Sequence, residues 1–273
     1  MKIPIGDDDG FDDVTLDATG AVALLTLNRP AKLNAMTLTM HRALFRAVRA
    51  VRDDAGLKVL VVTGTGRAFC AGDDMAESDP RDGIAPPEAE TELAWHNIVR
   101  EMRAMPKPIV AAVNGIACGA GGGLALAADL RFASDDAQFA DIFTKRGIAG
   151  GAYLLTQLVG TAKALELIFT GDFVSASEGL RIGLFNRVIA KADLMAETLA
   201  FAERLAKGPV QAYGLSKWAV YQAAHLHLNE GLRTEELAKL CSLRGAEVRE
   251  GIVAFNDRKR AGAAAPSRGG SPT

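Results

Sequence analysis

Short apolar runs alternate with amphipathic segments through the first two-thirds of the chain. Runs of this kind predict buried strands at residues 22–27, 58–63, 109–113, 131–133 and 138–139. Apolar residues at helical spacing predict helices at residues 37–55, 91–105 and 119–128. Strands that alternate with helices in this way indicate an α/β core.

The last third of the sequence has a different pattern. From about residue 151 the chain is mainly helical, and its longest helices are expected at 210–224 and 230–255. We therefore expect an α/β core over residues 12–205 and a helical appendage over 206–260. Residues 1–11 are acidic and expected to be flexible, and a Pro/Gly/Asp-rich excursion at 79–87 is expected to be mobile. Residues 261–273 are rich in Ala, Gly, Ser and Pro, so disorder is expected there.

Composition and charge narrow the class of protein. The 273 residues carry a net charge of −2, which offers no general field for nucleic acid or an anionic membrane. The most apolar stretch, 109–130, is interrupted by Asn114, Asp129 and several glycines, so a membrane span is not expected. Three cysteines without metal-binding spacing, and no signal-peptide pattern, indicate reduced thiols and a cytoplasmic location.

Two glycine-bearing loops, at residues 64–75 and 114–124, each follow an apolar strand and lead towards a helix. Free N–H groups point outward where a strand turns into a helix, so two such loops side by side could aim two donors at one oxygen. A dinucleotide fingerprint fits less well, because Leu124 stands where its third glycine belongs. A P-loop is excluded by the absence of Gly-Lys-Ser/Thr. The alternative that the glycines only permit tight packing stays open at this point.

Several segments in order resemble the crotonase (enoyl-CoA hydratase/isomerase) superfamily across nearly all of residues 12–260. They are NRPAKLNA at 28–35, GRAFCAGDD at 66–74, PIVAAVNGIA at 108–117, GAG at 119–121, GDFVSA at 171–176, GLFNRV at 183–188 and EGIVAF at 250–255. The resemblance implies a crotonase-like spiral of ββα units with a C-terminal helical appendage. It also implies a homotrimer or a hexamer made of two trimers, with trimer contacts in the helical C-terminal part.

The resemblance further implies an acyl-CoA thioester as the ligand, no metal, and no cofactor beyond the CoA of the substrate. It places the N–H donors of an oxyanion hole at Asp73 and Ala120. Residues expected near the acyl-CoA are Ala31, Lys32, Leu33, Ala35, Ala71, Gly72, Asp74, Met75, Ile116, Gly119, Phe143 and Gly147. Arg29 and Lys32 could also meet the CoA phosphates.

The sequence departs from the family at its acid–base residues. Hydratases of the family use two glutamates, and these align with Gly123 and Phe143. Several isomerases of the family carry an aspartate in the loop after Gly147, and here that loop is about three residues short and has no acid.

Two side chains remain as candidate proton carriers. The first is Asp141, which would share a face with Phe143 if that stretch is extended; the alternative is a structural acid in an ion pair. The second is His96, with Glu92 one helical turn before it; the alternative is a histidine on a helix surface.

Three functions follow as hypotheses. The first is an enzyme of the hydratase/isomerase type that acts through a thioester enolate, as a lyase or, next, an isomerase. The second is a protein that binds acyl-CoA without catalysis. The third is hydrolysis of a thioester or C–C bond on the same fold.

Overall fold

The computed structural model describes residues 1–5, 11–75 and 95–264. Contacts between Cα atoms divide the chain into two compact units, Met1–Gly208 and Pro209–Thr273. The expected mobile excursion at 79–87 lies outside the described residues. None of the helices in the described part of the chain combines the length and apolarity that a membrane span requires.

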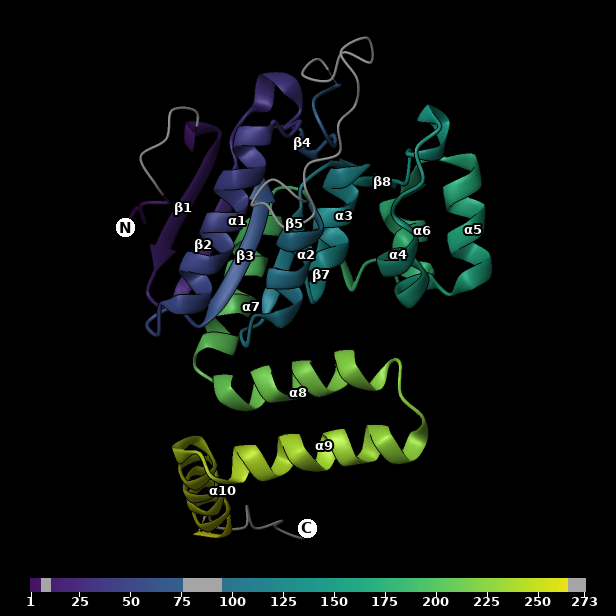
Figure 1. The fold of residues 1–273 in the computed structure, drawn as a ribbon. Helices are drawn as coiled ribbons and strands as arrows, with labels where there is room; N and C mark the ends of the chain where they lie inside the picture. Colours follow the sequence, from purple (N-terminus) through teal and green to yellow (C-terminus); the bar gives the residue numbers. More distant parts are fainter. Residues whose placement is uncertain (6–10, 76–94, 265–273) are drawn as a thin grey trace, which may run out of the picture. The chain divides into compact units, whose positions relative to one another are not determined.

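Two sheets form the framework of the first unit (Figure 1). Its strands are β1 (Val14–Thr19), β2 (Val22–Leu27), β3 (Val59–Gly64), β4 (Ala68–Cys70), β5 (Ile109–Val113), β6 (Ile116–Cys118), β7 (Leu130–Ser134), β8 (Gln138–Ala140), β9 (Val174–Ser175) and β10 (Arg187–Ile189). The larger sheet has the order β1-β2-β3-β5-β7-β10, and the smaller has β4-β6-β8-β9. Successive pairs β3/β4, β5/β6 and β7/β8 each give one strand to each sheet, so the chain advances as a spiral.

Most strand pairs are parallel, and only the outer pairs β1/β2 and β8/β9 are antiparallel among the described strands. β2 pairs with β3 in a register that runs from Val22 opposite Val59 to Leu27 opposite Gly64. The expected strands are all present. β1, β4, β6, β9 and β10 were not expected. The sequence of β1, VTLDAT, alternates apolar and polar residues, as an antiparallel strand at the end of a sheet often does.

The helices of the first unit are α1 (Leu38–Asp53), α2 (Trp95–Ala104), α3 (Ala120–Ala127), α4 (Ala152–Val159), α5 (Thr161–Thr170), α6 (Ala176–Arg181) and α7 (Leu194–Ala206). Thr37 begins α1, because its side chain accepts a hydrogen bond from the Met40 amide. α1 packs against α2, and α2 packs against α3, so the three lie side by side (Figure 1).

Strand residues alternate between two apolar cores. Leu60 and Val62 of β3 belong to the core that α1, α2 and α3 cover, whereas Val59 and Val61 belong to the core that α7 covers. Both faces of the larger sheet are therefore buried, which explains why its central strands read as uninterrupted apolar runs.

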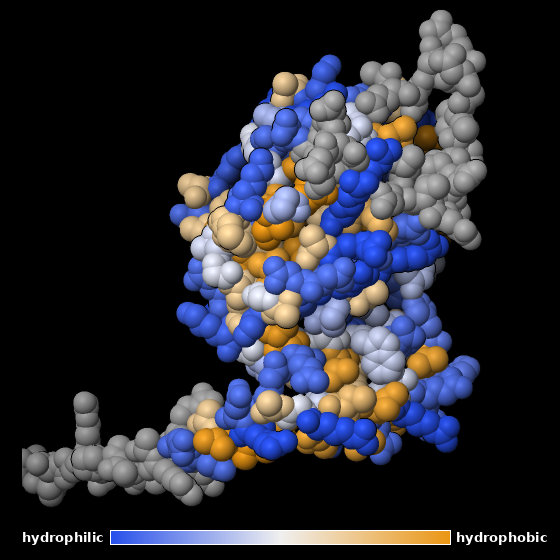
Figure 2. Space-filling model, turned by 60° about the vertical axis from the view of Figure 1, so that its left-hand side comes forward, coloured by the Kyte–Doolittle hydropathy of each residue, from blue (hydrophilic) through white to orange (hydrophobic). Residues whose placement is uncertain are grey.

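The second unit holds α8 (Val210–Ala223), α9 (Leu228–Leu243) and α10 (Ala246–Ala264). The single helix expected over 230–255 is wrong, because the chain turns at Arg244–Gly245 between α9 and α10. Residues 261–264, expected in the disordered tail, form the last turn of α10, and 265–273 lie outside the described residues. Leu228, Leu232 and Leu240 of α9 are more than half exposed. The face of the molecule in Figure 2 mixes apolar and hydrophilic surface.

Candidate active site

Asn34 joins the first predicted CoA-binding segment to the loop that connects β3 and β4. Its side chain is fully buried, and its amide nitrogen donates to the carbonyls of Thr65, Ala68 and Phe69 at 2.8–3.2 Å. Its side-chain oxygen accepts the Arg29 amide at 2.9 Å. Asn34 has a φ of +56°, a left-handed conformation that asparagine tolerates better than most residues.

The segments 31–36 and 71–75 lie beside each other as a short parallel bridge. The Ala71 amide donates to the Leu33 carbonyl, the Met36 amide to the Gly72 carbonyl, and the Asp74 amide to the Met36 carbonyl. Ala31, Lys32 and Met75 are exposed, while Leu33, Ala35, Ala71 and Asp74 are half-buried. The structure thus brings most of the predicted CoA-binding residues into one surface region.

Arg29 takes part in the same junction. Its guanidinium donates to the Asp74 carboxylate at 2.6 Å and to the Ala35 carbonyl at 3.1 Å. Both bonds come from Nη1, so Arg29 is a structural link between the two segments, while its side chain stays 22% exposed. Lys32 remains the exposed cation of the segment.

Gly72 brings the first glycine-bearing loop against the second. A Cβ on Gly72 would lie 3.5 Å from the Ala120 amide nitrogen and 3.0 Å from the Cys118 carbonyl. Gly72 also has a φ of +98°, which residues with a side chain rarely adopt. A larger residue here would push the two loops apart.

The amides of Asp73 and Ala120 are both left free by the local backbone. Successive amides of an extended chain point to opposite sides, so the Asp73 amide points away from Met36, to which the Asp74 amide donates. Ala120 is the first residue of α3, where an amide has no partner within the helix. Within the part of the chain that the structure describes, neither amide donates a hydrogen bond to a protein acceptor.

α3 packs directly on β4 because Gly121 has no side chain. A Cβ on Gly121 would lie 2.3 Å from the Cys70 carbonyl oxygen. Cys70 is fully buried, and burial raises the pKa of its thiol to about 12. Its Sγ donates to the Asn34 carbonyl at 3.0 Å. Cys70 therefore fills space in the core and is not a nucleophile.

Trp95 covers the position at which the resemblance puts the first hydratase glutamate. A Cβ on Gly123 would lie 2.9 Å from Cζ2 of Trp95 and 3.6 Å from its Nε1. The indole reaches Gly123 from the helix α2, which also buries Ile98 and Met102. The place of a carboxylate is therefore taken by an aromatic ring.

Asp141 is a buried acid next to the shortened loop. Its side chain contacts Gly151, where a Cβ would lie 1.6 Å from Oδ2, and its Oδ1 has no hydrogen-bond partner among the described residues. Burial raises the pKa of Asp141 to about 6, opposed by a hydrogen bond from the Phe143 amide. The residues on either side of Asp141, Ala140 and Ile142, contact the second glycine-bearing loop. The Gly119 amide donates to the Ala140 carbonyl, and the Ile142 side chain lies against Gly119.

The geometry that relates Asp141 to Phe143 differs from the expectation. β8 ends at Ala140, and Phe143 has helical dihedrals at the start of a short 3-10 helix, Thr144–Arg146. The two side chains therefore do not share a strand face. Each contacts the loop that follows, Asp141 at Gly151 and Phe143 at Gly150.

His96 follows Trp95 on α2. Residues adjacent in a helix point in directions about 100° apart, so His96 points away from the side on which Trp95 meets Gly123. His96 is exposed. Glu92, its expected partner, lies outside the described residues. Of the remaining predicted residues, Ile116 is half-buried, Gly119 is buried, and Gly147 is exposed.

One residue near the loops was not predicted as part of the site. His41 of α1 is buried, and its Nε2 lies 2.9 Å from Oδ1 of Asp73. The available signal was a histidine on the apolar face of an amphipathic helix, a place where its polar ring needs a partner. The sequence did not identify that partner, which is 32 residues further along the chain.

The family model described as enoyl-CoA hydratase/isomerase matches residues 17–262. A probable enoyl-CoA hydratase of Rhizobium meliloti is 34% identical over 254 residues, which is 92% of this chain and 97% of the relative. A 1,2-epoxyphenylacetyl-CoA isomerase of Escherichia coli is 35% identical over 239 residues, with 86% and 91% covered. A crystal structure of a putative enoyl-CoA hydratase from Streptomyces coelicolor superposes with a TM-score of 0.84 at 31% identity, with 93% and 94% covered.

Proposed function

The chain belongs to the enoyl-CoA hydratase/isomerase family of the crotonase superfamily. From this premise we propose that it removes an α-proton from an acyl-CoA thioester to form an enolate, and then returns a proton to that enolate. The amides of Asp73 and Ala120 bind the thioester oxygen. The observation that carries the proposal is the close approach of Gly72 to the Ala120 amide. The amides of Asp73 and Ala120 beside this contact donate to no acceptor among the residues that the structure describes.

The chemistry follows from charge. Two N–H donors aimed at a carbonyl oxygen stabilise the negative charge that develops there when an α-proton leaves. Removal of one such donor typically costs about 3–4 kcal/mol of transition-state stabilisation. The N-terminal end of α3 adds a positive partial charge at the same place.

We propose Asp141 as the proton carrier. A general base works best with a pKa near the working pH, and the pKa of Asp141 is raised to about 6. Its carboxylate contacts Gly151, in the loop where several isomerases of the family carry their aspartate. This favours proton transfer of the isomerase type over water addition, for which the two glutamates are replaced by Gly123 and Phe143.

Exchange of α-protons tests the enolate without assuming the final product. Phenylacetyl-CoA has acidic α-protons, and its deuterium uptake in D₂O is followed by mass spectrometry. We expect uptake with the wild type and a loss on the order of a hundredfold in Asp141→Asn. No uptake would refute the proposal. Loss of enoyl absorbance from crotonyl-CoA, or release of free CoA thiol, would identify a hydratase or a thioesterase instead.

The Ala120 amide is tested by Ala120→Pro, because proline lacks an N–H and is well accepted at the first position of a helix. We expect exchange to fall on the order of a hundredfold to a thousandfold with the fold intact. Thr161→Pro is the matched control, since Thr161 begins α5 after a glycine just as Ala120 begins α3. Equal exchange rates in the two variants would contradict the assignment of Ala120.

A second candidate function is binding of acyl-CoA without catalysis. Trp95 favours it, because its indole fills the place of a catalytic carboxylate at Gly123. A rise in the thermal unfolding midpoint with phenylacetyl-CoA, without deuterium uptake or turnover, is the result expected from this candidate.

We also propose self-association as a trimer or a pair of trimers. The leucines of α9 that are more than half exposed support it, because helices of monomeric proteins rarely leave such a row uncovered. Sedimentation equilibrium that returns the monomer mass of 28.7 kDa at micromolar concentration would refute it.

A further inference from the structure

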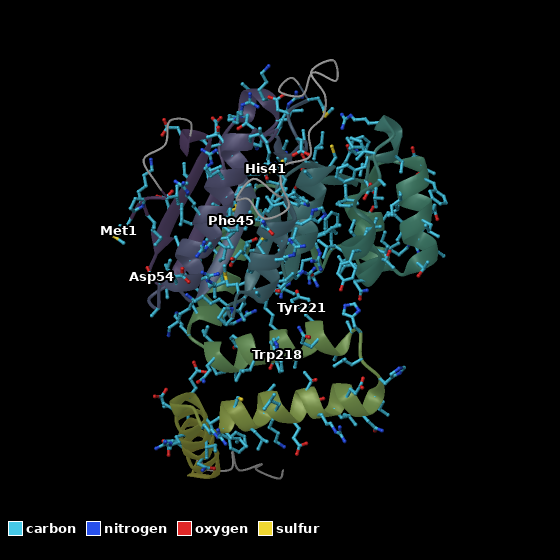
Figure 3. The ribbon with its side chains drawn as sticks, viewed as in Figure 1. Met1, His41, Phe45, Asp54, Trp218 and Tyr221 are labelled. Carbon is cyan, nitrogen blue, oxygen red and sulfur yellow. The ribbon has the colours of Figure 1, made fainter. Side chains whose placement is uncertain are left out.

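His41 of α1, labelled in Figure 3, is buried. It lies close both to Asp73, in the loop after β4, and to the ring of Trp95. Its side chain is only 8% exposed, and its ring centroid lies 6.0 Å from that of Trp95. Nε2 is 2.9 Å from Oδ1 of Asp73. The other ring nitrogen, Nδ1, is buried and has no hydrogen-bond partner in the described part of the protein.

These contacts indicate which ring nitrogen carries the proton. A buried N–H without an acceptor is costly, so a proton on Nδ1 is disfavoured. With its proton on Nε2, His41 donates directly to the Asp73 carboxylate. His41 therefore serves as a donor that is directed at a single residue of the first glycine loop.

Asp73 has two parts with opposite effects on a nearby oxyanion. Its amide is the proposed donor, whereas its carboxylate is negative and its side chain is 48% exposed. A carboxylate that turned towards the thioester oxygen would repel the charge that develops there. The side chain must consequently be held on the far side of the loop whenever the amide is in use.

We propose that His41 is the positioning residue that performs this task. It holds the Asp73 carboxylate on the α1 side of the loop, so that only the Asp73 amide faces the substrate oxygen. The inference rests on the proposed function, and it adds a residue that contacts neither the substrate nor the proton that moves.

Two substitutions separate this role from simple packing. His41→Leu fills much of the ring's space against Trp95 but removes the donor. His41→Gln places an N–H close to the position of Nε2 and keeps the donor. Deuterium uptake by phenylacetyl-CoA gives kcat and KM for each variant, and thermal unfolding reports the fold.

We expect His41→Leu to lower kcat on the order of tenfold to a hundredfold with little change in KM, because the released carboxylate opposes enolate formation. His41→Gln is expected to retain most of the rate. Adding Asp73→Ala to His41→Leu is expected to recover most of the lost kcat, since the amide remains and the charge is gone.

Three outcomes would overturn the inference. Equal losses in His41→Leu and His41→Gln, or a double variant as slow as His41→Leu, would show that His41 acts through packing. A wild type that exchanges no α-protons would overturn the proposed function and this inference together. Either of the first two outcomes, together with exchange by the wild type, would overturn the inference alone.

Discussion

The burial of Asp141 predicts how the free energy of unfolding depends on pH, independently of any substrate. Burial raises its pKa from the ordinary aspartate value of 3.8 to about 6, so the folded protein holds a proton that the unfolded chain releases. Asp141→Asn removes the ionisation and keeps an oxygen to accept the Phe143 amide. The two proteins should therefore differ in stability by an amount that depends on pH.

The magnitude follows from linkage. Below pH 3.8 the carboxyl is protonated in both states and has no effect on the pH dependence. As pH rises from 3.8 to about 6, the unfolded chain ionises first, so the wild type loses stability relative to the variant. Each pKa unit corresponds to about 1.4 kcal/mol, so the full rise amounts to about 3 kcal/mol above pH 6. The asparagine amide also introduces a buried N–H group, which shifts the variant by an amount that is the same at every pH.

Urea unfolding at matched protein concentration measures this difference. The free energy of unfolding of Asp141→Asn minus that of the wild type should increase by about 2–3 kcal/mol from roughly pH 4 to roughly pH 8. Asp172→Asn is the control for the same substitution at an exposed aspartate. A difference for Asp141→Asn that is flat with pH, or larger in acid, would refute the reasoning about its burial.

Three further predictions concern the residues that hold the loops. Asn34→Ala removes three donated hydrogen bonds and one accepted hydrogen bond from buried groups, so the free energy of unfolding measured in urea should fall by about 2–4 kcal/mol. The exposed Asn28→Ala is the control and should lose less than about 0.5 kcal/mol; an equal loss in both variants would contradict the role of Asn34. Gly123→Glu alone should lower the midpoint of thermal unfolding without raising crotonyl-CoA hydration, because its Cβ would lie 2.9 Å from Trp95, and adding Trp95→Ala should restore that midpoint. Hydration gained by Gly123→Glu alone would show that the indole of Trp95 does not block the position of the glutamate. Iodoacetamide in mildly alkaline buffer should label the exposed Cys241 first and should leave Cys70 unmodified until the protein unfolds, which peptide mass spectrometry measures. Early labelling of Cys70 would contradict the burial and the raised pKa of its thiol.

The sequence by itself determined the family, the five strands β2, β3, β5, β7 and β8, and the helices α1, α2 and α3. Strands such as β2 and β5 were recognisable because both faces of the larger sheet are buried, which requires uninterrupted apolar runs. The two glycine loops were recognisable because close backbone approach excludes side chains, as at Gly72 and Gly121. β1 shows a different pattern, an alternation of apolar and polar residues that is typical of a strand with one covered face, and it was not among the expected strands.

Only the tertiary structure decided which residues meet at the candidate site. A pattern of apolar and polar positions reports that a residue is buried, but not which residue from a distant segment lies against it. Trp95 covers Gly123 because α2 packs against α3, and Asp141 meets Gly151 because the chain turns back after β8. His41 reaches Asp73 across 32 residues because the parallel bridge between Met36 and Asp73 brings the start of α1 beside the loop after β4. Sequence therefore identified the loops, while the arrangement of strands and helices selected the side chains that face them.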